Sequence, residues 1–152
     1  MIPGAHTVRI DFRSTFEMLD VVQVVSEHLG RLAGLDDDAV HWVTVAVRES
    51  VINAIKHGNG GDEHKQVHVD FTPLDVDAPR GIAIRVRDEG AGFDPESVPN
   101  PLAPENLLKN SGRGIFLIRS FMDEVALQRA AEGGMEIVMV KRAGSAELQQ
   151  AE

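Results

Sequence analysis

The chain divides into segments where apolar and polar residues alternate and segments where apolar residues recur every three to four positions. Alternation predicts strands at about 7–12, 66–74, 81–87, 124–130 and 135–142, because neighbouring side chains of a strand point to opposite faces. The other segments predict helices at about 15–33, 36–57 and 113–122. The predicted order is therefore β-α-α-β-β, a long loop, and then α-β-β.

The first two helices carry start signals and apolar stripes. Ser14 and Glu17 form an S-x-x-E capping-box pattern before the first helix, and Asp36 precedes the second. We expect one stripe to contain Leu19, Val22, Val25, Leu29 and Leu32, and the other to contain Val43, Val47, Val51 and Ala54. We also expect Trp42 in the core, because aromatic side chains mainly bury area.

These elements indicate the α+β class. Strands joined by short turns pair in antiparallel fashion. We therefore predict a two-layer α/β sandwich in which helices pack on a mixed, largely antiparallel sheet. The length of 152 residues suits a single domain over 1–152, with its core at about 6–142.

Composition narrows the class of partner and the compartment. The formal charge is −9 and no Lys/Arg cluster is visible, so we expect no binding to nucleic acid or to an anionic membrane. The sequence has no cysteine, no apolar run of roughly 20 residues and no basic or apolar leader in MIPGAHTVRIDF. These features favour a cytoplasmic protein.

Glu49 and Asn53 are four residues apart on the second predicted helix, so they share one face. An amide oxygen can ligate Mg²⁺, and a carboxylate can orient or deprotonate a nucleophile. Taken alone, such a pair more often belongs to a solvated helix face.

Asp88 closes a predicted strand and is followed by Gly90 and Gly92. Its carboxylate can accept a hydrogen bond from an exocyclic amine, and the glycines let the backbone approach a planar ligand. A plain strand-ending turn has the same D-x-G pattern.

Gly112, Arg113 and Gly114 open the third predicted helix. Backbone N–H groups at a glycine-rich helix start favour a phosphate group, although a flexible helix cap has the same composition. No G-x-x-x-x-G-K-[ST] run is present, so we predict no P-loop.

Together the three motifs resemble those of the GHKL ATPase superfamily, which has the Bergerat nucleotide-binding fold. The matching residues are Glu49 to Ala54 with His57-Gly58, then Asp88 to Gly92, then Gly112 to Gly114. Within the superfamily, the runs SGRGI at 111–115 and SFMDEV at 120–125 are similar to those of bacterial anti-sigma factor serine kinases. The resemblance covers about residues 6 to 142.

The resemblance implies a role for each matching residue. Glu49 would be the general base, Asn53 the Mg²⁺ ligand and Asp88 the partner of the adenine amino group. The other residues expected around ATP are His57, Gly90, Gly92, Lys109, Gly112, Arg113, Gly114 and Met135. Residues 93–111 would form a lid over the nucleotide. Met135 stands where the family often has a threonine.

The resemblance also implies a function. We expect an ATP-binding, Mg²⁺-dependent anti-sigma factor with serine/threonine kinase activity. It would phosphorylate an anti-anti-sigma partner, sequester a sigma factor and form a homodimer. Two alternatives are a non-catalytic, ATP-dependent regulatory binding module and a detached histidine-kinase-type ATPase domain.

The histidines other than His57 show no metal-ligand spacing. We expect them, His68 included, on the surface or in loops.

Overall fold

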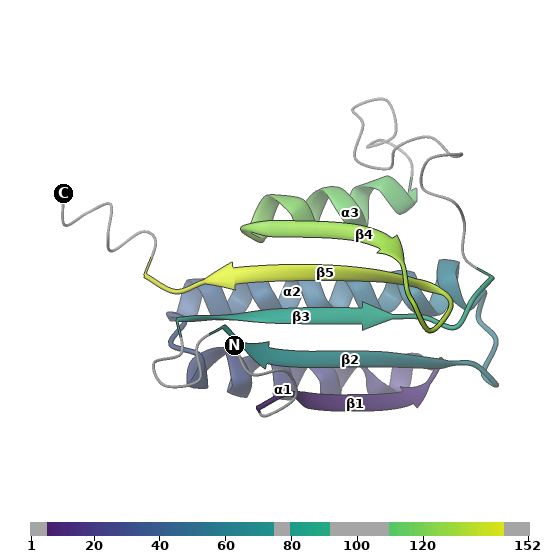
Figure 1. The fold of residues 1–152 in the computed structure, drawn as a ribbon, viewed down its shortest axis with the longest axis horizontal. Helices are drawn as coiled ribbons and strands as arrows, with labels where there is room; N and C mark the ends of the chain where they lie inside the picture. The colour runs from purple at the N-terminus through teal and green to yellow at the C-terminus, as the bar shows by residue number, and fades with distance from the viewer. Residues whose placement is uncertain (1–5, 75–79, 92–109, 145–152) are drawn as a thin grey trace.

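Helices and strands form two layers in this computed structural model, which describes residues 6–74, 80–91 and 110–144 (Figure 1). The strands are β1 (Val8–Arg13), β2 (Gln66–Pro73), β3 (Gly81–Arg87), β4 (Glu124–Arg129) and β5 (Met135–Arg142). The helices are α1 (Leu19–Leu32), α2 (Asp37–Asn53) and α3 (Asn110–Phe121), with a 3-10 turn at Phe16–Met18 and a π-helical turn at Ala54–Gly58. The predicted order of elements is confirmed.

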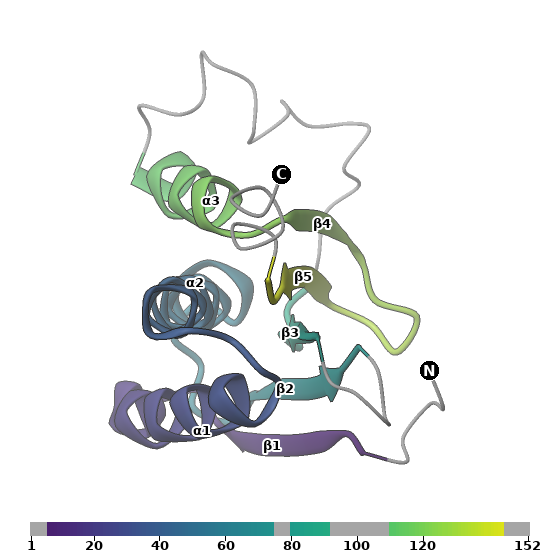
Figure 2. The ribbon, with the colours of Figure 1, turned by 90° about the vertical axis from the view of Figure 1, so that its left-hand side faces the viewer.

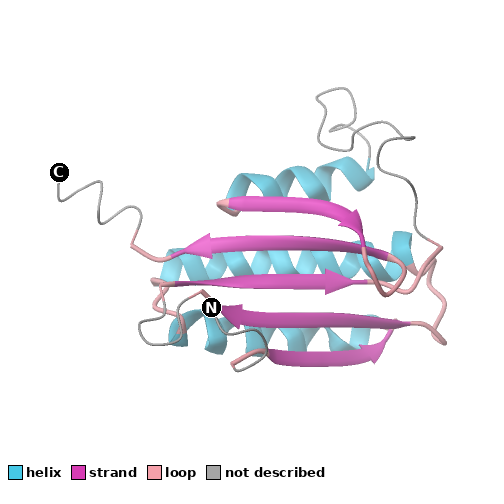
Figure 3. Cartoon of the chain, viewed as in Figure 1, coloured by secondary structure: helices cyan, strands magenta, loops and turns pink. Residues whose placement is uncertain are grey.

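The sheet has the order β1-β2-β3-β5-β4, and each neighbouring pair is antiparallel. The predicted α+β class is confirmed, and no parallel pair occurs among the described strands (Figure 3). After β3 the chain returns through α3 to the edge strand β4, and β5 then turns back between β4 and β3. This path places the β4–β5 turn beside the end of β3.

All three α-helices lie against one face of the sheet (Figure 2). That covered face is apolar, and it meets the buried stripe of α2, so burial of this surface supplies the main stabilisation of the fold. Its buried residues include Val67, Val69, Phe71, Ile82, Ile84, Val86, Ile137 and Met139. The other face has no covering layer among the described residues, and charged side chains line the half nearest the end of β3.

The start and the stripe of α1 differ from the prediction. Leu32 is 63% exposed, whereas Ser26 and Gly30 are buried. Small residues let α1 approach α2 closely, since a Cβ at Gly30 would lie 3.4 Å from a Val40 methyl group. The capping box is also wrong, because Thr15 and Met18 occupy the N-cap positions of the 3-10 turn and of α1, and neither makes a side-chain cap hydrogen bond. Ser14 Oγ instead accepts a hydrogen bond from Asn59 Nδ2 at 3.3 Å.

Helix α2 follows the prediction at its start and along its stripe. Asp36 Oδ1 accepts a hydrogen bond from Ala39 N at 2.8 Å, and the predicted stripe is buried. Trp42, however, is 37% exposed rather than in the core, and its ring stacks on Phe121 of α3 with centroids 4.2 Å apart. The last turn is π-helical, a feature that often marks functional sites.

Helix α3 begins at Asn110, three residues before its predicted start. The glycines of the third motif therefore lie within its first turns rather than ahead of it. The predicted lid, 93–111, lies outside the described residues except for its last two, which are helical. The assignment of one domain over 1–152 stays a prediction. Within the described residues, no helix is long and apolar enough to cross a membrane.

Candidate functional site

Asp88 is held at the end of β3 by the first residue of β5. Its backbone N donates to Met135 O at 3.0 Å, and its Oδ1 accepts from Met135 N at 3.1 Å and from Gly90 N at 2.9 Å. Asp88 is buried, yet no described residue donates a hydrogen bond to its Oδ2. One carboxylate oxygen is therefore fixed by backbone N–H groups, and the second is left to accept a hydrogen bond from a ligand.

Three glycines from three chain segments enclose Asp88. A Cβ at Gly58 would collide with the Asp88 carboxylate, and one at Gly134 would collide with its carbonyl. A Cβ at Gly90 would collide with Gly58 O. Gly134 also has a φ of 81°, a conformation that favours glycine. Any side chain at these positions would push the carboxylate or the backbone around it out of place.

The residue after Asp88 is also fixed. Asn59, only 3% exposed, accepts a hydrogen bond from Glu89 N at 2.8 Å and donates to Gln66 O at 3.0 Å. Glu89 Oε1 in turn accepts from Gln66 N at 2.9 Å. The turn that begins at Asp88 is therefore anchored to the start of β2.

Glu49 and Asn53 meet the start of α3. A Cβ at Gly114 would lie 3.0 Å from Asn53 Nδ2 and 3.4 Å from Glu49 Oε2, so both side chains reach this glycine. The N-terminus of a helix attracts anions, because its first N–H groups lack partners within the helix. A carboxylate and an amide thus come together beside the first turns of α3.

A cavity of about 60 Å³ lies between α2, α3 and the sheet. Its lining residues are Ser50, Asn53, Ala54, Val86, Asp88, Ile115, Leu127, Met135, Glu136 and Ile137. The walls are mainly apolar, and both Asn53 and Asp88 contribute to them. Ligand pockets usually measure roughly 300–1,000 Å³, so this cavity is too small for a whole nucleotide.

The comparisons with known proteins agree with this geometry. A family model described as the histidine kinase-like ATPase domain matches residues 12–141. The chain belongs to the histidine kinase-like ATPase family. It is similar to the serine-protein kinase RsbW of Staphylococcus epidermidis, with 31% identity over 132 residues, which cover 82% of this chain and 79% of that protein. Membership of the family implies ATP binding.

Two further comparisons concern another relative and the fold. The serine-protein kinase RsbW of Listeria monocytogenes is 29% identical over 115 residues, which cover 72% of this chain and 69% of that protein. A crystal structure of the RsbU and RsbW domains of a Mycobacterium tuberculosis protein matches with a TM-score of 0.62 and 18% identity. That match covers 90% of this chain and 32% of the longer one, and it supports the fold alone.

The described residues fit the base of ATP. Asp88 Oδ2, to which no described residue donates, can accept from an exocyclic amine, and the cavity walls are mainly apolar. Met135 is buried, lines the cavity and donates its backbone N–H to Asp88.

The remaining predicted site residues do not line the cavity beside Asp88 among the described residues. The side chain of His57 is exposed on the π-helical turn. Gly112 and Arg113 lie in the first turns of α3, where the side chain of Arg113 is outside the description. Gly92 and Lys109 lie outside the described residues.

The sequence patterns missed several residues of the site. The apolar residues that line the cavity from α3, β4 and β5 (Ile115, Leu127 and Ile137) have the sequence pattern of ordinary core residues. Gly134 was visible as a turn residue, but its contact with Asp88 depends on the pairing of β3 with β5. His68 was expected on the surface or in a loop. It lies on β2, on the open face of the sheet, where carboxylates on either side leave its side chain 12% exposed.

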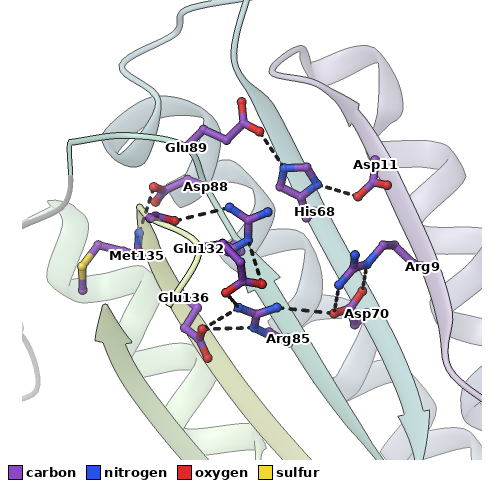
Figure 4. Close-up of polar contacts among 12 residues, drawn as sticks. Arg9, Asp11, His68, Asp70, Arg85, Asp88, Glu89, Glu132, Met135 and Glu136 are labelled. Atoms are coloured by element: carbon purple, nitrogen blue, oxygen red, sulfur yellow. Dashed lines mark hydrogen bonds and ion pairs between the residues drawn. The ribbon is translucent and has the colours of Figure 1, made fainter. Parts of the chain in front are cut away.

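A charged cluster on the open face anchors the β4–β5 turn (Figure 4). Arg85 Nη2 donates to Glu136 Oε1 at 2.7 Å and to Glu132 Oε1 at 2.8 Å. The hydrogen bond from Arg85 holds the pKa of Glu132 at about 2, and Glu136 and Glu132 raise the pKa of Arg85. Arg87 Nη1 also donates to Gly133 O at 3.3 Å. These contacts hold the β4–β5 turn in the position that packs Gly134 against Asp88.

Proposed function

We propose that this chain is a protein serine/threonine kinase that binds Mg-ATP and phosphorylates an anti-anti-sigma partner, and that it also sequesters a sigma factor. The carrying observation is that Glu49, Asn53 and Gly114 meet beside the cavity that Asp88 also lines. One site thereby combines an acceptor for the adenine amino group, a ligand for Mg²⁺ and a carboxylate near the first turns of α3. The similarity to RsbW kinases and the motif resemblance support the choice of partners.

Asp88 and the cavity walls supply base recognition in this proposal. Oδ2 accepts a hydrogen bond from the adenine amino group, while Oδ1 stays bonded to Gly90 N and Met135 N. Guanine carries a carbonyl oxygen at the equivalent position, and two acceptors that face each other repel. The site therefore selects ATP over GTP.

Glu49 and Asn53 supply the chemistry. Asn53 Oδ1 would hold Mg²⁺, which neutralises phosphate charge when it is bound. Glu49 accepts the proton of the partner's serine or threonine hydroxyl as that oxygen bonds to the γ-phosphorus of the substrate ATP. The bond from this phosphorus to its bridging oxygen breaks, ADP leaves, and Glu49 then releases the proton to water.

Binding and transfer are tested in sequence. Mg-ATP at about 100 times its dissociation constant should stabilise the fold by roughly 2.7 kcal/mol, seen as a higher melting temperature. Radiolabelled ATP is then mixed with a purified anti-anti-sigma protein. Glu49→Gln keeps the shape of the side chain and removes the proton acceptor, so transfer should fall about 100- to 10,000-fold while ATP affinity changes little.

Glu63→Gln is the matched control, because Glu63 is an exposed carboxylate in the loop before β2. It should leave transfer and binding unchanged. Absence of nucleotide binding at millimolar ATP, confirmed by calorimetry, would contradict the whole proposal.

A non-catalytic, ATP-dependent binding module is the second candidate, favoured by one observation. Met135 offers only a thioether to the cavity, where the motif resemblance leads us to expect a hydroxyl. A wild-type protein that binds ATP and its partner without phosphorylating it would favour this module. So would undiminished transfer by Glu49→Gln.

We also propose that the chain forms a homodimer, on the strength of the same resemblance. Light scattering at micromolar concentration should give about twice the mass of 16.5 kDa. A single-chain mass throughout the concentration range would contradict this.

A further inference from the structure

The imidazole of His68 lies between two carboxylates on the open face of the sheet (Figure 4). Its Nδ1 is 2.5 Å from Asp11 Oδ1 on β1, and its Nε2 is 2.8 Å from Glu89 Oε2 after β3. The ring therefore connects the edge strand β1, through β2, to the residue that follows Asp88. A single metal ion would not explain this arrangement, since the two nitrogens face opposite sides.

Glu89 is the point where this bridge reaches the nucleotide site. Its carboxylate accepts from Gln66 N and contacts His68, and its backbone N donates to Asn59 Oδ1. The hydrogen bonds from Gln66 N and His68 lower the pKa of Glu89. The carboxylate is therefore ionised at neutral pH, and these contacts fix the turn on one side of Asp88.

The orientation of this turn sets the geometry around Asp88. Gly90, one residue beyond Glu89, directs its N–H to Asp88 Oδ1 at 2.9 Å. If Glu89 moved, this N–H would turn away, and the Asp88 carboxylate could rotate. We infer that His68 is a positioning residue for nucleotide binding, whose ring, placed between Asp11 and Glu89, holds Glu89 and thereby orients Asp88. This inference rests on the nucleotide-binding role of Asp88 proposed above.

Protonation decides whether both contacts form. An imidazolium ion donates from both nitrogens, whereas a neutral ring has one N–H and must lose one of its two carboxylate partners. Both contacts therefore need a ring that carries a proton on each nitrogen. The surrounding charges are Asp11, Arg9 and Arg13 on β1, Asp70 on β2, Arg85 and Arg87 on β3, and Glu89 beyond it.

The experiment follows Mg-ADP affinity of the full chain by calorimetry from pH 6 to pH 9. Wild-type affinity should fall about fivefold with rising pH, the scale of one partly exposed ion pair. His68→Gln cannot donate to both carboxylates, so its affinity should be about fivefold lower at pH 6 and nearly independent of pH. Asp11→Asn removes a charge that favours the imidazolium, so the fall should move to lower pH.

Arg9→Gln is the matched control. Arg9 also links β1 to β2 on the open face, with Nε 2.6 Å from Asp70 Oδ1, but this pair does not reach Glu89. It should keep the wild-type affinity and pH profile. Urea melts should show that His68→Gln and Arg9→Gln remain folded. If His68→Gln does not fold, Asp11→Asn still tests the inference, because Asp11 is exposed and its substitution should not disturb the core.

The outcomes distinguish a failure of the role of His68 from a failure of nucleotide binding itself. Wild-type protein that binds Mg-ADP with a flat pH profile, or with the same profile in Asp11→Asn, would overturn the role of His68 and leave nucleotide binding intact. Folded wild-type protein that binds no nucleotide at any pH would overturn the proposed function itself.

Discussion

The two ends of the candidate nucleotide site are built in different ways. At the base end, three glycines and two backbone N–H groups from separate segments surround Asp88. At the phosphate end, Glu49 and Asn53 extend from one helix toward Gly114 of another, and among the described residues no backbone group bonds to their functional atoms. Changes that break the glycine enclosure at the base end should therefore disturb the fold and the affinity together. Changes at the phosphate end should alter metal binding or catalysis and leave the fold intact.

The largest expected effect is that of Gly58→Ala at the base end. The new Cβ would collide with the Asp88 carboxylate, which would have to leave the N–H groups of Gly90 and Met135. Overpacking and loss of these bonds should lower the free energy of unfolding by about 3 kcal/mol. Urea unfolding measures this loss, and calorimetry should find no ATP binding at concentrations that saturate the wild type.

Gly30→Ala serves as the control for this substitution. A Cβ at Gly30 would lie 3.4 Å from Val40, far from the site, and alanine favours a helix by about 1 kcal/mol over glycine. Its nucleotide affinity should equal that of the wild type. Normal ATP affinity in Gly58→Ala would mean that the close contact with Asp88 is not needed for binding.

Asp88→Asn should have the next largest effect, and it acts on the ligand more than on the fold. The amide oxygen can still accept from Gly90 N and Met135 N, so stability should change little. The amide nitrogen then replaces Oδ2 and presents a donor to the adenine amino group, which is itself a donor. We expect about 2 kcal/mol weaker ATP binding, or roughly 30-fold.

The preference for ATP over GTP should disappear in this variant, because the amide nitrogen can donate to a guanine carbonyl. Parallel titrations with both nucleotides measure it. If Asp88→Asn still binds ATP normally and far better than GTP, Asp88 only ends a strand.

Much of the fold could be predicted from local patterns. Strands β3 and β5 end where the alternation of side chains predicts, and the stripe of α2 is buried as expected. The errors have a common cause in tertiary packing. Ser26 and Gly30 are not apolar, but their small size lets α1 and α2 approach. Trp42 stacks on Phe121 near the surface, a contact that no pattern within one helix reveals.

The site was predictable only in part, for a related reason. The resemblance singled out Glu49, Asn53 and Gly114, and the structure brings these three together. It also singled out Asp88, but not the enclosure of Asp88 by Gly58 and Gly134. That enclosure depends on the pairing of Arg87 with Glu136, which aligns Asp88 with Met135 across two strands. Contacts between distant segments, like the one from His68 to Glu89, do not follow from local spacing.

At the phosphate end, Asn53→Ala should weaken Mg-ATP binding without changing the fold. The side chain is partly exposed, and its amide makes no hydrogen bond to a described residue. Loss of one metal contact should weaken binding by about tenfold. Metal-free ATP should bind the variant and the wild type equally, and calorimetry with and without Mg²⁺ separates the two. A similar loss of ATP affinity without Mg²⁺ would mean that Asn53 is not a ligand of the metal.

Met135→Thr should have the smallest effect, and it tests whether the base end can be improved. The methionine thioether is at most a weak acceptor, whereas a hydroxyl both donates and accepts. The backbone bonds of residue 135 to Asp88 should survive, since threonine is well suited to a strand. One added hydrogen bond to the base should tighten ATP binding by about 1 kcal/mol, or roughly fivefold. Met135→Val has a similarly branched side chain without the hydroxyl, so calorimetry on both variants isolates the hydroxyl from the lost thioether. Equal affinities in the two variants, or weaker binding in Met135→Thr than in the wild type, would mean that the base end has adapted to methionine and that its affinity comes from packing.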